Sequence, residues 1–399
     1  MNNLRRIFSF AILSIAPIVL LVGRGGAAPS PNRKYIAYVG NYTTKTDSKG
    51  IYDFRFDATT GKMTALELAG ETKDPSWIVL HPNGKFLYAA NETGKTSTIS
   101  AFSIEPKTGK LTPLNTVSAL GEDPCHLSFD RTGKYLLVAN YTSGNVVVFP
   151  IEADGKLGGH TANVKDEGTL GPNKERQDGP HAHWIKPLEN NTRVYVADLG
   201  LDRLIMYQFD AAKGTLSKAP THSDWAPSVT LDPSAKLVQG TGPRHAVFAK
   251  GDLLMYVLGE LQSTVTAFHM VGTDLFTPTS FQRISALPEG FSGRNDAAEI
   301  AMHPSGKFIY TSNRGNDTVA IFKVDQHSGR LQLVADVSTG GKEPRHFAID
   351  PTGTFLLAEN QNTNVIVEFR IDRATGKLTP TGETLAVPSP ICLVFLPIE

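Results

Sequence analysis

The sequence is poor in cysteine and has no excess of charge of either sign. Only two of its 399 residues are cysteine, and 39 Lys and Arg residues balance 39 Asp and Glu residues. The low cysteine count excludes a small fold stapled by disulfides. The zero net charge provides no basic face for nucleic acid, so we expect no nucleic-acid partner.

Long apolar runs are also absent, except at the N-terminus. There Arg5 and Arg6 precede an apolar run over residues 7–22, and the small residues 25–28 follow it. This is the order of a secretory signal, and the run is short for a membrane span. The stretch "RRIFSF" is weakly similar to a twin-arginine signal.

We therefore expect residues 1–28 to be a signal peptide and residues 29–399 to form one domain. An uncleaved membrane anchor is the alternative for the N-terminal segment. The signal predicts export to the periplasm or the medium, and no stable membrane insertion is expected after its cleavage.

Helical periodicity is the third absence, whereas short alternating segments are frequent. Three patterns recur in a fixed order. The first is a Gly-Lys turn before an apolar strand, as in "HPNGKFLYAAN" and "HPSGKFIYTSN". The second is an aromatic strand that runs into a Gly-centred turn, as in "FSIEPKTGKLT" and "FRIDRATGKLT". The third is a Pro-led alternating strand, as in "DPCHLSFD", "GPRHAVFAK" and "EPRHFAID".

The aromatic pattern occurs seven times, and its starts lie 47 to 61 residues apart. Each period has room for four short strands punctuated by Gly, Pro, Asn and Asp. This spacing is typical of a β-propeller blade, and radial packing of the sheets covers both of their apolar faces.

The two ends of the chain predict how the ring closes. The repeats open on "YIAYVGN", with no Pro-led strand before it, and finish on the Pro-led "SPICLVFLP". Together these fragments make one blade. The predicted fold is all-β: a seven-bladed β-propeller of four-stranded antiparallel blades, closed by the C-terminal strand. Cys125 and Cys392 fall in non-adjacent blades, so we expect no disulfide between them.

The Pro-led strands are expected to line the hub, because the first strand of a blade lies nearest the channel. The positions just after each Pro are rich in Arg and His, and the count in "GPHAH" gives His181 the place of Arg244. In "DAAEIAMHP" the His-Pro that follows aligns Glu299 with His126. The side chains expected to converge are His126, His181, His183, Arg244, His245, Glu299, Arg345 and His346.

Packing alone rarely gathers Arg and His at one depth, so we interpret this set as a site. Hydrogen bonding at strand ends is the structural alternative. A further ring is expected where the second strands end, at Asn41, Asn91, Asn140, Asp198, Glu260, Arg314 and Asn360. Asn and Asp suit turns there, whereas the long charged side chains of Glu260 and Arg314 indicate function.

Other catalytic chemistry has less support. No Ser stands in G-x-S-x-G, which argues against a serine hydrolase. His181 and His183 share a strand face and with His126 or His245 resemble part of a metal site, but no carboxylate or cysteine completes the set. No clustered acidic ligands suit calcium. We therefore expect neither a metal nor another cofactor.

The repeats as a set resemble the seven-bladed lactonase family. The likeness rests on the "F-x-x-D-x-x-T-G-K-L-T" copies together with "GPHAH", "GPRH", "HPSGKFIYTSNRGNDTVAIF" and "EPRHFAIDPTGTFLLAEN". It covers residues 34–397. The family includes 6-phosphogluconolactonases and carboxy-cis,cis-muconate cyclases, and it implies lactone chemistry in the central cleft without an obligatory metal.

The resemblance also implies a catalytic set of a His, two Arg and a Glu. The matching residues are His181 or His183, Arg244, Arg314 and Glu260. The remaining hub residues would then bind substrate: His126, His245, Glu299, Arg345 and His346.

The expected function is hydrolysis of a sugar or aldono-lactone, a small-molecule substrate, in the manner of a 6-phosphogluconolactonase. A muconate-type lactonizing cycloisomerase and a non-catalytic propeller that binds a ligand or protein are the alternatives. The long stretches 158–178 and 283–297 are expected near the cleft, as lids or as solvated loops. The sequence sets no oligomeric state.

Overall fold

The computed structural model describes residues 34–218, 222–223, 226–230, 235–270 and 278–398. The predicted signal peptide, residues 1–28, lies outside them. Within the described part of the chain, no helix has the length and apolar character needed to cross a membrane.

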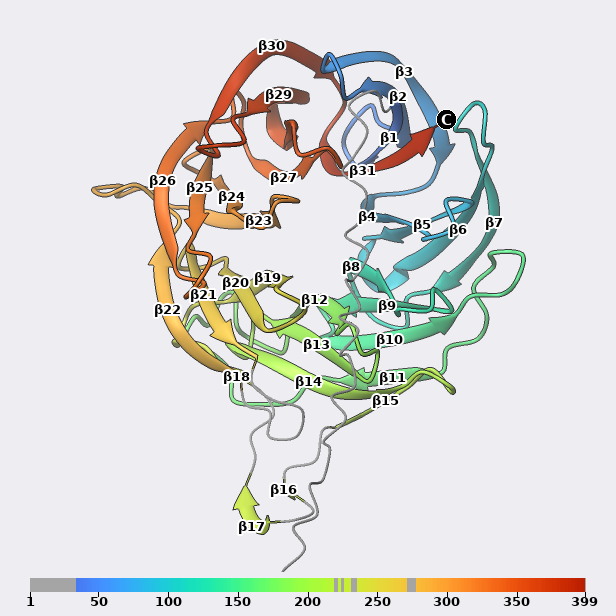
Figure 1. Cartoon of the computed structure of the whole chain (residues 1–399). Coiled ribbons are helices and arrows are strands. Elements are labelled where there is room, and N and C mark those ends of the chain that lie inside the picture. Colours follow the sequence, from blue (N-terminus) through green and yellow to red (C-terminus); the bar gives the residue numbers. More distant parts are fainter. Residues whose placement is uncertain (1–33, 219–221, 224–225, 231–234, 271–277, 399) are drawn as a thin grey trace, which may run out of the picture.

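Seven four-stranded antiparallel blades surround a central axis (Figure 1). Blades 1 to 4, from hub to rim, consist of β31 (Pro390–Ile398), β1 (Lys34–Asn41), β2 (Gly50–Asp57) and β3 (Lys62–Glu71); β4 (Pro75–Leu80), β5 (Phe86–Asn91), β6 (Thr98–Ile104) and β7 (Leu111–Ser118); β8 (Pro124–Phe129), β9 (Tyr135–Asn140), β10 (Asn145–Pro150) and β11 (Ala162–Lys165); and β12 (Ala182–Pro187), β13 (Arg193–Asp198), β14 (Arg203–Asp210) and β15 (Thr215–Lys218).

Blades 5 to 7 follow the same order. They consist of β19 (Pro243–Ala249), β20 (Leu254–Gly259), β21 (Thr264–His269) and β22 (Thr279–Ser285); β23 (Asp296–Met302), β24 (Phe308–Arg314), β25 (Thr318–Val324) and β26 (Leu331–Ser338); and β27 (Pro344–Ile349), β28 (Phe355–Asn360), β29 (Val365–Ile371) and β30 (Leu378–Ala386). Outside this pattern lie β16 (His222–Ser223), β17 (Ala226–Thr230), β18 (Ala235–Lys236), which pairs with β14, and the 3-10 turns Gly94–Thr96 and Gln361–Thr363.

The C-terminal strand closes the ring, as predicted. Strand β31 pairs with β1 along its length, from Lys34 opposite Ile398 to Asn41 opposite Pro390. The first blade therefore joins the two ends of the described chain. Cys125 and Cys392 are buried and unbridged, which confirms the expectation of no disulfide.

A repeated tyrosine contact explains the Gly-centred turn motif. The second strand of a blade buries a Tyr whose hydroxyl donates to the carbonyl of a turn glycine in the next blade, at 2.7 to 2.8 Å. The pairs are Tyr38–Gly109, Tyr88–Gly155, Tyr256–Gly329 and Tyr310–Gly376. These glycines have φ of 74° to 86°, a left-handed conformation that glycine adopts without strain. The motif thus locks each blade to its neighbour, and an apolar core fills the space between them.

Candidate functional site

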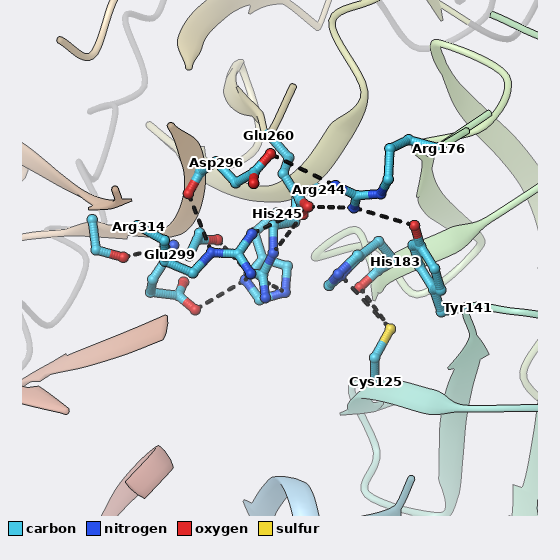
Figure 2. A network of polar contacts seen from close by, with 12 residues as sticks. Cys125, Tyr141, Arg176, His183, Arg244, His245, Glu260, Asp296, Glu299 and Arg314 are labelled. Atoms are coloured by element: carbon cyan, nitrogen blue, oxygen red, sulfur yellow. Dashed lines mark hydrogen bonds and ion pairs between the residues drawn. The ribbon is translucent and has the colours of Figure 1, made fainter. Parts of the chain in front are cut away.

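A bulge in the innermost strands directs extra side chains to the hub. In β19, Pro243 pairs with Gly259 and the next pair begins at His245, so Arg244 is an additional residue. Regular strands alternate their side chains between two faces, and a bulge interrupts that alternation. Arg244 and His245 therefore both enter the hub network (Figure 2). The same shift occurs between Pro75 and Trp77, Pro124 and His126, and Pro344 and His346.

Blade 4 has this bulge two residues later than the sequence count predicts. The ladder of β12 begins at Ala182, and His183 is the additional residue. The assignment of His181 to the place of Arg244 is therefore wrong, because His183 occupies that place.

His181 lies before β12 and is fully engaged. Its ring stacks on Tyr141 with centroids 4.6 Å apart. Its Nδ1 lies 3.0 Å from the Tyr141 carbonyl oxygen, and its Nε2 lies 2.9 Å from Asp178 Oδ1. Because both nitrogens face acceptors, His181 has no free lone pair to accept a proton.

His183 is buried in the hub and offers a nitrogen for chemistry. Its Nδ1 lies 3.6 Å from Cys125 Sγ, and its ring centroid lies 5.2 Å from that of His245. Its Nε2 makes no hydrogen bond with any residue that the structure describes. Burial lowers the pKa of His183 well below its usual value, so the imidazole is neutral.

Three guanidinium groups surround the carboxylate of Glu260, which follows β20 (Figure 2). Its Oε2 lies 3.0 Å from Arg244 Nε. Its Oε1 lies 3.1 Å from Arg314 Nη2 and 2.5 Å from Arg176 Nη2. We call these four residues the Glu260 cluster.

Charge in the Glu260 cluster is fixed at neutral pH. Burial alone would raise the pKa of Glu260, but Arg314, Arg244 and Arg176 lower it to about 2. Burial lowers the pKa of Arg244 to about 10, which still leaves it charged. The cluster therefore presents preorganised guanidinium donors to the hub.

A second carboxylate, Glu299, is surrounded by imidazoles. Its Oε2 lies 2.9 Å from His245 Nδ1 and 3.7 Å from His346 Nε2. The other nitrogen of His346, Nδ1, lies 2.6 Å from Glu359 Oε2. We call Glu299, His245, His346 and Glu359 the Glu299 cluster. It touches the Glu260 cluster, since Arg244 Nη1 lies 3.3 Å from His245 Nε2.

The two imidazoles of the Glu299 cluster have opposite pKa shifts. Burial lowers the pKa of His245 to about 4 even though Glu299 opposes it. Burial would also lower the pKa of His346, but Glu359 and Glu299 on either side of it raise the value above normal. This cluster therefore holds its proton on His346 rather than on His245.

The remaining predicted hub residues lie around these clusters. The Trp77 ring contacts three histidines, with centroid distances of 4.7 Å to His126, 5.1 Å to His245 and 5.4 Å to His346. Burial lowers the pKa of His126 well below its usual value. Arg345 lies apart from both carboxylates, with its guanidinium 5.6 Å from the centre of the Tyr42 ring.

The ends of the second strands form two rings rather than one. Residues opposite the first residue of each inner strand are buried Asn or Asp in most blades: Asn41, Asn91, Asn140, Asp198, Gly259, Asn313 and Asn360. Their contacts are local, as in Asn91 Nδ2, which donates to Ser100 Oγ at 2.7 Å. Glu260 and Arg314 occur one position later, where the chain turns toward the hub.

Sequence reasoning missed the other members of that later ring. Tyr42, Glu92 and Tyr141 stand at the position of Glu260, and the Tyr42 hydroxyl donates to Glu92 Oε2 at 2.9 Å. Aligning the residue after each strand-ending Asn would have found them. Glu359, which precedes Asn360, was missed for the same reason.

The two long inter-blade stretches both reach the hub, which confirms their expected position. Arg176 of 158–178 lies against Glu260, and its Nη1 is 3.6 Å from Asp296 Oδ1 of 283–297. Neither residue belongs to the repeats, so the repeat pattern does not predict their contacts. In the described residues, no group of three or more His, Cys, Asp or Glu side chains is arranged to hold a metal ion.

Comparison with protein families assigns this architecture. Residues 36–395 match the family described as lactonase, 7-bladed beta-propeller. The chain belongs to the seven-bladed β-propeller lactonase family. This confirms the family, the fold and the reaction class expected from the repeats, and it makes the chain a lactone-hydrolysing enzyme.

Individual relatives of this lactonase span nearly the whole of their own length. A 6-phosphogluconolactonase of Bacillus subtilis is 36% identical over 91% of this chain and 99% of its own. A solved Bacteroides fragilis structure, provisionally described as a 6-phosphogluconolactonase, has a TM-score of 0.81 and 34% identity over 92% of this chain and 99% of its own. A periplasmic gluconolactonase of Pseudomonas aeruginosa has a TM-score of 0.81 and 29% identity over 92% and 100%. These relatives do not favour a cycloisomerase or a non-catalytic binding propeller for the lactonase.

Proposed function

We propose that this lactonase hydrolyses an aldono-lactone of the gluconolactone type in its hub, with the Glu260 cluster stabilising the transition state. The observation that carries the proposal is the burial of Arg244 and Arg314 against an ionised Glu260. The named activities of the Bacillus and Pseudomonas relatives support the substrate class.

The first step is attack of water on the lactone carbonyl. The oxygen of water bonds to the carbonyl carbon, and one water proton passes to His183 Nε2. The Cys125 thiol lies 3.6 Å from the His183 carbonyl oxygen and can donate to it, so its sulfur can accept the His183 Nδ1 proton. That tautomer leaves the lone pair on Nε2.

The second step opens the ring. Guanidinium donors of Arg244 and Arg314 stabilise the oxyanion as it forms, and Glu260 keeps both side chains in place. The ring C–O bond then breaks, and the leaving alkoxide takes the proton back from His183. The product is the open-chain hydroxy acid, and no metal takes part in these steps.

A substrate panel tests this function. We expect turnover of phosphorylated or free gluconolactone, or both, that survives a chelator, and none of muconolactone. His183→Gln should reduce kcat by about 100-fold, on the scale of lost acid–base catalysis, while the matched control His327→Gln, on the exposed surface, should not change it. Absence of turnover on every lactone contradicts the proposal.

We also propose that the enzyme is exported, with residues 1–28 as the signal. Support comes from the order of charged, apolar and small residues in that segment and from the periplasmic location of the Pseudomonas relative. Cell fractionation should find the full chain outside the cytoplasm and a variant without residues 1–28 inside it. Cytoplasmic recovery of the full chain contradicts export.

A further inference from the structure

Arg176 differs from the other arginines of the Glu260 cluster in origin and exposure. It comes from the long stretch between blades 3 and 4, whereas Arg244 and Arg314 come from the blade repeat. Its side chain is 30% exposed, compared with 4% for Arg244 and 9% for Arg314. An incoming ligand therefore meets Arg176 before it meets the other two.

A compact turn fixes the position of Arg176. The backbone N–H of Gln177 donates to the Asn173 carbonyl at 2.7 Å, and the Asn173 side chain accepts from the Arg176 N–H at 3.2 Å. The Gln177 side chain is buried and donates to the Leu199 carbonyl at 2.8 Å. The turn is thus tied to the strand end of blade 4, and Arg176 projects from a built support.

Arg176 can release Glu260 without leaving that carboxylate unpaired. Glu260 retains Arg244 at 3.0 Å and Arg314 at 3.1 Å. The Nη2 of Arg176 makes the short contact to Glu260, whereas its Nη1 is 3.6 Å from Asp296, too far for a hydrogen bond. Within the described residues, Nη1 and Nε of Arg176 donate no hydrogen bond.

We propose that Arg176 is a specificity-determining residue that binds a second anionic group of the lactone, a phosphate or a carboxylate remote from the ring ester. This inference rests on the proposed function. A guanidinium pairs with phosphate or carboxylate oxygens through two parallel N–H donors, and Arg176 has donors to spare at the exposed edge of the site. The buried arginines act on the ester, and Arg176 selects which lactone is placed there.

Steady-state kinetics on three substrates test the assignment. The substrates are 6-phosphogluconolactone, glucarolactone with its free carboxylate, and uncharged gluconolactone. Arg176→Gln is expected to lower the ratio of kcat/KM for an anionic lactone over the uncharged one by at least ~10-fold, mainly through KM, on the scale of charged hydrogen bonds. The two anionic substrates distinguish a phosphate from a carboxylate as the group bound.

Two further variants separate recognition from charge and from folding. Arg176→Lys should restore part of the ratio, because it keeps the charge and loses the two-donor geometry. The control is Arg294→Gln, which removes an 85% exposed guanidinium 3.4 Å from Asp296 and should leave the ratio unchanged. Inorganic phosphate should inhibit uncharged-lactone turnover more weakly in Arg176→Gln than in the wild type.

The outcomes are distinguishable. Equal losses on all three substrates, or no loss on any, overturn the role of Arg176 while the lactonase function stands. A wild-type enzyme that hydrolyses only the uncharged lactone overturns it as well. A wild-type enzyme that hydrolyses none of the three overturns the proposed function and the Arg176 assignment with it.

Discussion

Two buried carboxylates in the hub are compensated in different ways. Glu260 is held by three guanidinium groups, and Glu299 by two imidazoles. Both are buried, and their clusters meet where Arg244 packs on His245. The pKa of each carboxyl group is lowered against the effect of burial, to about 2 for Glu260.

The difference lies in what the partners do with protons. Guanidinium does not deprotonate in proteins, so the Glu260 cluster is a fixed charge. Imidazole gains and loses a proton within the working range of an enzyme, so the Glu299 cluster holds a proton that can move. The hub thus places charge stabilisation beside proton storage, and substitutions on each side should have different signatures.

The largest effect is expected from removing the fixed charge at its centre. Glu260→Gln leaves three guanidinium groups without a carboxylate and should lower the free energy of unfolding by about 3–5 kcal/mol, the range for breaking a buried ion pair. Because the pKa of Glu260 is lowered in the fold, its contribution is present above its ordinary pKa of 4.5 and is lost as pH falls toward 2.

Denaturant unfolding at pH 7 and pH 3 measures this contribution. The deficit of Glu260→Gln should be smaller at the lower pH. The control is Glu343→Gln, because Glu343 Oε1 lies 3.9 Å from Arg314 and its side chain is 32% exposed. Equal stability of Glu260→Gln and the wild type at pH 7 would remove the fixed charge from the account.

Removing a single donor comes next. Arg244→Ala should lower kcat by at least ~100-fold, the scale for loss of one electrostatic donor to an oxyanion. Stopped-flow or coupled assays measure kcat, and circular dichroism checks that the variant is folded. Near-normal turnover in a folded variant would exclude Arg244 from the reaction.

On the proton-holding side the expected signature is a pH shift rather than a loss. Glu359 raises the pKa of His346, so Glu359→Gln should let His346 lose its proton at lower pH. If that proton orients Glu299 and His245, the alkaline limb of the kcat/KM profile should move to lower pH by up to about one unit. Glu359 acts here as a positioning residue, and an unchanged profile with altered stability would leave it a purely structural role.

The sequence predicts the repetitive parts of this comparison well. The Gly-centred turns, the Pro-led strands and the broken blade at the ends determine the propeller, because each pattern reports a contact made seven-fold around the ring. Arg244, Glu260 and Arg314 stand out because they replace the residues that the repeat normally has at their positions.

The missed residues follow from what a repeat does not encode. The bulge in β12 moves with Ala182 rather than with the Pro of "GPHAH", so counting from that Pro misplaces His181. Arg176 lies in a stretch with no counterpart in the other blades, and only the folded chain brings it to Glu260. Irregular segments and bulges therefore limited the site prediction, whereas the strands did not.

A third buried carboxylate, with no cation in contact, completes the comparison. Glu368 on β29 lies between blades 7 and 1, and neither of its carboxylate oxygens has a hydrogen-bond partner in the described residues. Burial raises its pKa from 4.5 to about 7. Its protonated form is therefore the one the fold prefers, in contrast to Glu260.

The sign of the resulting effect on stability is opposite to that of Glu260. A raised pKa gives stability that is complete below pH 4.5 and is lost as pH rises through about 7. Glu368→Gln removes that loss, so it should raise the free energy of unfolding at pH 8 by on the order of 1 kcal/mol and change it little at pH 4. Thermal melts at both pH values measure the difference. A variant that is less stable than the wild type at pH 8 would show that Glu368 is ionised and paired, and would break the ordering of the three carboxylates by their partners.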